Sequence, residues 1–93
     1  MRAIEYATSF KRDYKRQTKG RYRLSLDRDL TLVLNHLVMD QPLESKYCDH
    51  DLNGNLAGYR ECHIKPNLLL IYQKSNTDTL RLARLGSHSD LFG

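Results

Sequence analysis

The chain has 93 residues, of which 40% are hydrophobic and 28% charged, enough for one compact domain over residues 1–93 and too apolar for a disordered chain. The first ten residues lack the apolar stretch of a signal peptide, and the longest later apolar run, Leu68 to Tyr72, is too short to cross a membrane, so we expect a cytoplasmic protein with no membrane partner. The net charge of +4 is uneven: residues 1–28 hold nine Lys or Arg against three acids, which favours a polyanionic partner.

The first third of the sequence predicts a short strand and a basic helix. Arg2 to Tyr6 alternates weakly, as a strand does. Thr8 is expected to cap a helix that runs to about Lys19 and ends at Gly20. One side of this helix carries Phe10, Tyr14 and Gln17. The other side carries Lys11, Arg12, Lys15, Arg16 and Lys19. A charged face is usually only solvated, but here Asp13 alone dilutes the positive charge, which favours a docking surface for a polyanion.

The middle of the chain predicts a second helix and a long loop. The helix should begin between Leu24 and Asp27, end near Met39, and pack one apolar stripe on a sheet. The stripe consists of Leu26, Leu30, Val33, Leu34 and Leu37. Residues Pro42 to Ala57 lack a clear period and predict a long loop, which in a compact domain is often functional.

Three strands joined by short turns should follow, at about Gly58–Ile64, Leu68–Lys74 and Thr79–Leu85. Short connections form antiparallel hairpins, so we predict an α+β fold in which an N-terminal strand and two helices precede a three-stranded antiparallel meander. The sheet is expected to be wholly antiparallel, with both helices on one face and the other face open to a ligand. Simple alternation places Arg84 on the same side of the last strand as Leu80 and Leu82.

Three histidines of the C-terminal half indicate acid–base chemistry. Glu61 and His63 are two residues apart in a predicted strand and share a face. His88 follows the last strand, and His50 lies in the long loop. Any one of them is more often a structural or surface residue than a catalyst. Together they favour proton transfer, because the unperturbed pKa of imidazole is about 6.5.

A zinc site is the main chemical rival, because Cys48, His50, Cys62 and His63 are suitable ligand types. Adjacent residues of a strand face opposite sides, and no Cys-x-x-Cys pair is present, so we expect no metal. Both cysteines are expected to be reduced thiols, and nothing places either one beside a histidine as a nucleophile.

The second half of the chain resembles the YafQ branch of the RelE/ParE toxin superfamily. The resemblance lies in segments Gly58–Asn67, Leu69–Tyr72 and Arg84–Phe92 and in Asp49-His50. The resemblance covers residues 47 to 93 well and implies a RelE-like fold and a toxin of a bacterial type II toxin–antitoxin pair. Such a toxin enters the A site of the 70S ribosome and cleaves messenger RNA without a cofactor. The 2′-hydroxyl of the RNA attacks the adjacent phosphate, giving a 2′,3′-cyclic phosphate and a free 5′-hydroxyl. The implied partners are a cognate antitoxin of the DinJ/RelB kind and, only through the antitoxin complex, operator DNA.

The resemblance also implies roles for individual residues. His88 matches the principal catalytic histidine and is the candidate general acid, while His50 and His63 are candidate bases or phosphate ligands. Arg84 would stabilise charge on the phosphate, and Phe92 would stack on a base or, as an equal alternative, anchor the C-terminus in the core. The resemblance further implies that Glu61 belongs to the catalytic site, that Asn67 and Arg60 bind substrate, and that the basic helix face binds ribosomal RNA. Glu61 stands where the family often has Asp, and Asn67 and Leu68 stand where one member of the family has Asp and Trp. Asn67 cannot act as a base.

Two other functions share parts of this pattern. The ParE branch has the same fold and poisons DNA gyrase without cutting RNA, and the basic helix alone would equally suit a non-enzymatic nucleic-acid-binding module. Neither function needs three histidines around one pocket, so the histidines favour the ribonuclease.

Overall fold

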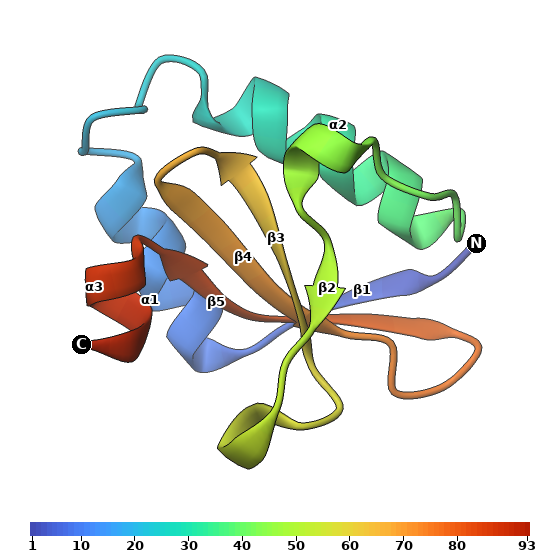
Figure 1. Cartoon of the computed structure of the whole chain (residues 1–93). Helices are drawn as coiled ribbons and strands as arrows, with labels where there is room; N and C mark the ends of the chain where they lie inside the picture. The colour runs from blue at the N-terminus through green and yellow to red at the C-terminus, as the bar shows by residue number, and fades with distance from the viewer.

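A computed structural model describes all 93 residues and places two helices against one face of a five-stranded sheet (Figure 1). The main elements are β1 (Ala3–Tyr6), α1 (Thr8–Gln17), α2 (Leu26–Val38), β2 (His50–Asp51), β3 (Arg60–Lys65), β4 (Leu68–Gln73), β5 (Thr79–Gly86) and α3 (His88–Phe92). Two 3₁₀ turns, Ser45–Tyr47 and Gly54–Leu56, flank β2. The α+β prediction is confirmed. None of the helices is long and apolar enough to span a membrane.

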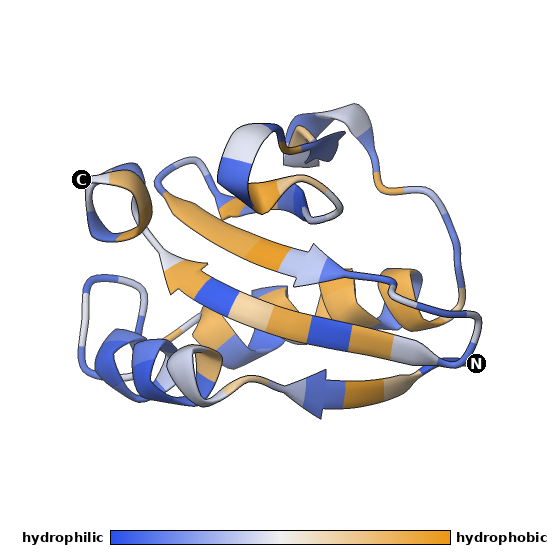
Figure 2. Cartoon of the chain, turned by 90° about the horizontal axis from the view of Figure 1, so that it is seen from below, coloured by the Kyte–Doolittle hydropathy of each residue, from blue (hydrophilic) through white to orange (hydrophobic).

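The sheet has the order β1-β5-β4-β3-β2 and is mixed, so the prediction of a wholly antiparallel sheet is wrong. The β3–β4–β5 meander is antiparallel as predicted, but β1 runs parallel to β5, with Ile4 opposite Leu80 (Figure 2). Two helices separate β1 from the meander, and a crossover of that length allows the parallel arrangement.

The core lies between the two helices and the sheet. Leu26, Leu30, Val33 and Leu37 of α2 are buried, as their spacing predicts, and Leu34 packs at the margin of the core. Strand β4 is almost continuously hydrophobic in Figure 2, and Leu68 to Tyr72 are at most 1% exposed. Leu69 and Ile71 belong to the face away from the helices, so this face is covered at its centre and not fully open.

Strand β5 contains a register shift that changes which side chains face the core. Ile71 lies opposite Arg84, but the next residue, Tyr72, lies opposite Leu82, so Ala83 is an extra residue on β5. A bulge of this kind moves every following side chain to the other face. Leu85 therefore joins the core, whereas Arg84 takes the second face, contrary to the simple alternation expected from sequence.

Helix α1 covers the part of β5 that β1 leaves unpaired. The Ser9 hydroxyl donates to the Ala83 carbonyl at 2.8 Å, and the Leu85 amide donates to the Asp13 carboxylate at 3.0 Å. Asp13 is therefore 2% exposed and does not lie on the basic outer face as expected. Ala7, not Thr8, is the N-cap residue, and the helix ends at Gln17, two residues earlier than predicted.

Replacing Asp13 tests this edge contact. Asp13→Ala leaves the Leu85 amide without an acceptor, and we expect the free energy of unfolding to fall by about 1–3 kcal/mol. Asp13→Asn retains a carbonyl oxygen that can accept from Leu85, so its loss should be smaller. Urea denaturation of the two variants measures this difference, and equal losses would show that the hydrogen bond to Leu85 is not the main contribution.

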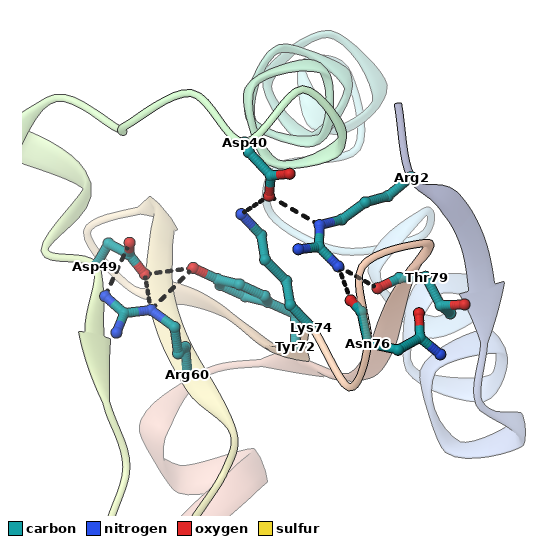
Figure 3. A network of polar contacts seen from close by, with 8 residues as sticks. All are labelled: Arg2, Asp40, Asp49, Arg60, Tyr72, Lys74, Asn76 and Thr79. Atoms are coloured by element: carbon teal, nitrogen blue, oxygen red, sulfur yellow. Dashed lines mark hydrogen bonds and ion pairs between the residues drawn. The ribbon is translucent and has the colours of Figure 1, made fainter.

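Asp40, just after α2, links the end of that helix to the N-terminal segment and to the segment after β4. Its carboxylate accepts from the Arg2 guanidinium at 2.8 Å and from the Lys74 ammonium at 2.7 Å (Figure 3). Arg2 also donates to the backbone carbonyls of Asn76 and Thr79. Lys74 and Arg2 lower the pKa of the Asp40 carboxyl from its usual 3.8 to about 2.

Asp40→Asn should therefore change the acid sensitivity of the fold. A lowered folded-state pKa stabilises the protein above about pH 3.8, and this contribution disappears as the pH falls through about 2. Asn tolerates the positive φ of 55° at this position, so the backbone is kept. We expect the difference in urea midpoint between wild type and variant to shrink on acidification and in about 1 M salt. A difference independent of both would contradict the ion-pair explanation.

Candidate functional site

A buried carboxylate, Glu61 of β3, lies at the centre of the candidate site. Its side chain is 4% exposed and is surrounded by three imidazoles. The Nε2 atoms of His63, His88 and His50 lie 3.6, 3.9 and 4.0 Å from its carboxylate oxygens. No Lys or Arg forms an ion pair with it. The convergence of the three histidines that the sequence predicts is therefore present in the fold.

Sheet register explains the meeting of β2 and β3. His50 lies directly opposite Glu61, and His63 follows Glu61 by two residues on the same face. The expected loop over residues 42–57 thus contains a strand, β2, whose two residues the hydrophobic pattern could not reveal. His50 Nδ1 lies 2.6 Å from the Cys48 carbonyl oxygen, which can only accept. In the neutral ring Nδ1 therefore carries the proton, and Nε2, which faces Glu61, has the free lone pair.

His88 follows the last strand, as predicted, and is the first residue of α3, a helix that the sequence analysis does not predict. Ser87 and Asp90 form a reciprocal capping box that starts this helix. Gly86 lets the helix fold back closely on β5, because a Cβ at this position would lie 2.9 Å from Cβ of Asp90. The His88 ring then meets His63 edge-on, with ring centroids 6.2 Å apart.

Phe92 extends the exposed side of the site. It is 46% exposed, its ring centroid lies 5.8 Å from that of His88, and it is absent from the hydrophobic core. The arrangement does not match the alternative of a C-terminal core anchor. A half-exposed aromatic ring beside an imidazole offers a surface on which a base can stack.

The two arginines singled out from sequence are both held by carboxylates. Arg84 shares a cross-strand row with Ile71 and Glu61, and its Nε donates to Asp13 at 2.7 Å, which raises the pKa of the guanidinium. Arg60 lies on the helix-facing side of β3, where it binds Asp49 and Asp51. Arg60 therefore lies on the opposite face of the sheet from the histidine cluster, and its contact with substrate stays a prediction.

The turn after β3 and its surroundings lie at the His63 end of the sheet. Asn67 is exposed in this turn, while Leu68 is buried in the core. A hollow of about 560 Å³ opens beside His63 and is lined in part by Arg28, Lys46 and Lys65. Asp29 binds both Arg28 and Lys65, so part of this positive charge is neutralised.

The cysteines lie apart from one another. Cys62 points into the core, where burial raises the pKa of its thiol, and Cys48 is exposed. They form no disulfide, and no group of three or more His, Cys, Asp or Glu side chains is arranged to hold a metal ion. Cys62 and His63 face opposite sides of β3, as their adjacency requires.

The basic residues of the first helical segment are all exposed. These are Lys11, Arg12, Lys15, Arg16 and Lys19. Arg16 also binds buried Asp13 at 2.7 Å, and Lys19 lies in the turn after α1. The sequence analysis does not predict that Asp13 is buried. Its position three residues after Phe10, on the apolar side of the helix, is nevertheless a signal of burial. The Ser87-x-x-Asp90 pattern likewise signals the helix that was missed.

Comparisons with known proteins identify relatives along the whole chain. A family described as "Bacterial toxin of type II toxin-antitoxin system, YafQ" matches residues 2–93. The mRNA interferase toxin YafQ of Escherichia coli K12 is 38% identical over 93 residues, covering 99% of this chain and 97% of the relative.

Solved structures agree in fold. A copper-bound mutant toxin from Helicobacter pylori has a TM-score of 0.87 at 36% identity, covering 99% of this chain and 100% of that one. The toxin of the Escherichia coli DinJ–YafQ toxin–antitoxin complex has a TM-score of 0.84 at 35% identity, covering 99% of this chain and 98% of that one.

Proposed function

This chain belongs to the YafQ family of bacterial type II toxins, and we propose that it is an endoribonuclease that cleaves messenger RNA in the ribosomal A site. In this proposal residues 1–93 make one toxin domain. The observation that carries it is the cluster of His50, His63 and His88 around buried Glu61. Such a cluster can both accept and donate protons, whereas a ParE-like gyrase poison or a passive nucleic-acid-binding module has no use for it.

The cluster supports a transesterification with two proton transfers. His50 or His63 removes the proton of the 2′-hydroxyl, whose oxygen attacks the adjacent phosphorus and forms the cyclic phosphate. The bond from phosphorus to the 5′-oxygen breaks, and His88 donates a proton to that oxygen. Glu61 stabilises whichever imidazole is protonated, because its negative charge lies within 4.0 Å of all three rings.

Residues around the cluster would bind the substrate. Phe92 would stack on a base of the codon, and Arg84 would stabilise negative charge on the phosphate while Asp13 holds its guanidinium. Asn67, in the exposed turn, would donate or accept a hydrogen bond without acting as a base.

His88→Ala tests the acid role. A general acid contributes about 10²- to 10⁴-fold to rate, so the variant should lose nearly all cleavage while folding and binding ribosomes normally. Primer extension on a translated messenger measures the cuts, and Phe92→Ala is the milder comparison because it removes no proton donor. Toxin that has been dialysed against EDTA and then returned to buffer before the assay should cleave like untreated toxin, since the proposed steps need no metal bound to the protein. A His88→Ala rate within about tenfold of wild type would move the role to another histidine.

We propose that the basic face of α1 binds ribosomal RNA. Replacing Lys11, Lys15 and Lys19 with Gln should weaken ribosome binding and flatten its dependence on salt, because fewer counterions are released. These side chains are exposed and make no ion pairs, so the fold should be unaffected. Sedimentation with 70S ribosomes over a salt series measures the effect. Unchanged binding would leave the face with a solubilising role alone.

We also propose a cognate antitoxin, because a relative of the same fold forms a complex with the antitoxin DinJ. The antitoxin should be acidic where it meets residues 1–28, and binding to operator DNA would occur only through the complex. Co-expression with neighbouring open reading frames should restore growth of cells that make the toxin. Failure of every adjacent frame to restore growth would argue against a paired system.

A further inference from the structure

We infer that Asp49, bound by Tyr72 and Arg60 beneath β2, is a positioning residue that fixes the orientation and the protonated nitrogen of His50. The inference rests on the proposed function, in which His50 is one of the two candidate bases, and it assigns that role to His50. It concerns residues on the opposite face of the sheet from the histidine cluster, which would act on cleavage only through His50.

The contacts of Asp49 anchor it firmly. The Tyr72 hydroxyl donates to Asp49 Oδ1 at 2.5 Å, and Arg60 reaches both carboxylate oxygens, Nε at 3.3 Å and a terminal nitrogen at 3.1 Å (Figure 3). Tyr72 is 1% exposed and belongs to the core. A side chain bound to this hydroxyl is therefore tied to the most rigid part of the sheet.

Asp51, on the other side of His50, is tied to the same group. Arg60 donates to Asp51 at 2.5 Å, so one guanidinium holds both neighbours of His50. Side chains alternate along an extended segment, which directs Asp49 and Asp51 to the helix-facing side and His50 to the Glu61 side. Strand β2 pairs through only two residues, too few to fix its position by backbone hydrogen bonds alone.

The anchored backbone also determines which nitrogen of the neutral His50 ring carries the proton. Cys48, immediately before Asp49, has a φ of 50°, and its carbonyl accepts from His50 Nδ1. This hydrogen bond leaves Nε2 of the neutral ring free to accept a proton. A shift of the backbone at Asp49 would move the Cys48 carbonyl and release the ring. Burial and Asp49 raise the pKa of Tyr72, so its hydroxyl remains a donor at neutral pH.

Tyr72→Phe is the decisive substitution, because it removes one hydroxyl and keeps the buried ring. Misplacing a catalytic group by 1 Å can cost about 10²-fold, so we expect single-turnover cleavage to slow by at least about tenfold with little change in ribosome affinity. Tyr22→Phe is the matched control: its ring also packs against the core and its hydroxyl forms no hydrogen bond, so it should cleave like wild type.

A double substitution separates positioning from a general structural role. In a His50→Ala background, Tyr72→Phe should cause no further loss of cleavage, because the group it positions is gone. The same loss in both backgrounds, or wild-type cleavage by Tyr72→Phe alone, would overturn the inference.

Imidazole ¹⁵N NMR at mildly alkaline pH provides a readout independent of cleavage. Wild-type His50 should show a proton on Nδ1, and Tyr72→Phe should shift the ring toward a mixture of tautomers, with His36 as an internal reference. An unchanged His50 spectrum would overturn the positioning inference. If the tautomer shifts as expected but neither wild type nor His50→Ala cleaves messenger, the proposed function fails while the inference about His50 stands.

Discussion

The layout of the candidate site depends on the burial of the Glu61 carboxylate, whose only ionisable neighbours within 4.0 Å are three imidazoles. A carboxylate removed from water is stable only when positive charge or hydrogen-bond donors compensate it. Three separate segments supply that compensation: β2 with His50, β3 with His63, and α3 with His88. Because imidazole can gain or lose a proton near neutral pH, the same contacts that make the burial tolerable also supply groups for acid–base chemistry.

The protein contains a second buried carboxylate, Asp13. The partners of Asp13 suit a structural contact, whereas the partners of Glu61 suit proton transfer. Asp13 accepts from a backbone amide and from two arginines, whose charge does not change in any physiological condition. Its environment suits a permanent structural contact between α1 and β5. Glu61 has partners whose charge can change, and it lies beside exposed rings that a substrate can reach.

Both flanks of the sheet are completed by side chains where backbone pairing stops. On one side β1 pairs with β5 only as far as Leu82, and Ser9 and Asp13 satisfy the edge beyond it. On the other side β2 pairs through two residues, and Arg60 holds the aspartates around His50. Polar side chains thus stabilise both edges of the sheet at the points where backbone pairing ends. The exposed edge of a short strand would otherwise be free to shift or to pair with another chain.

The local sequence pattern predicted the two helices, the β3–β4–β5 meander and the shared face of Glu61 and His63. It also contained the motifs that resemble the YafQ family. Each of these features depends on residues close in sequence. Tertiary structure alone decided the parallel pairing of β1, the pairing of His50 with Glu61, and the bulge that turns Arg84 away from the core. It also decided which group the Asp13 carboxylate binds, since the Leu85 amide that donates to it is 72 residues away. A periodicity reports which side of an element is apolar, but not which distant backbone group needs a partner, and the candidate site is built mainly from such long-range partners.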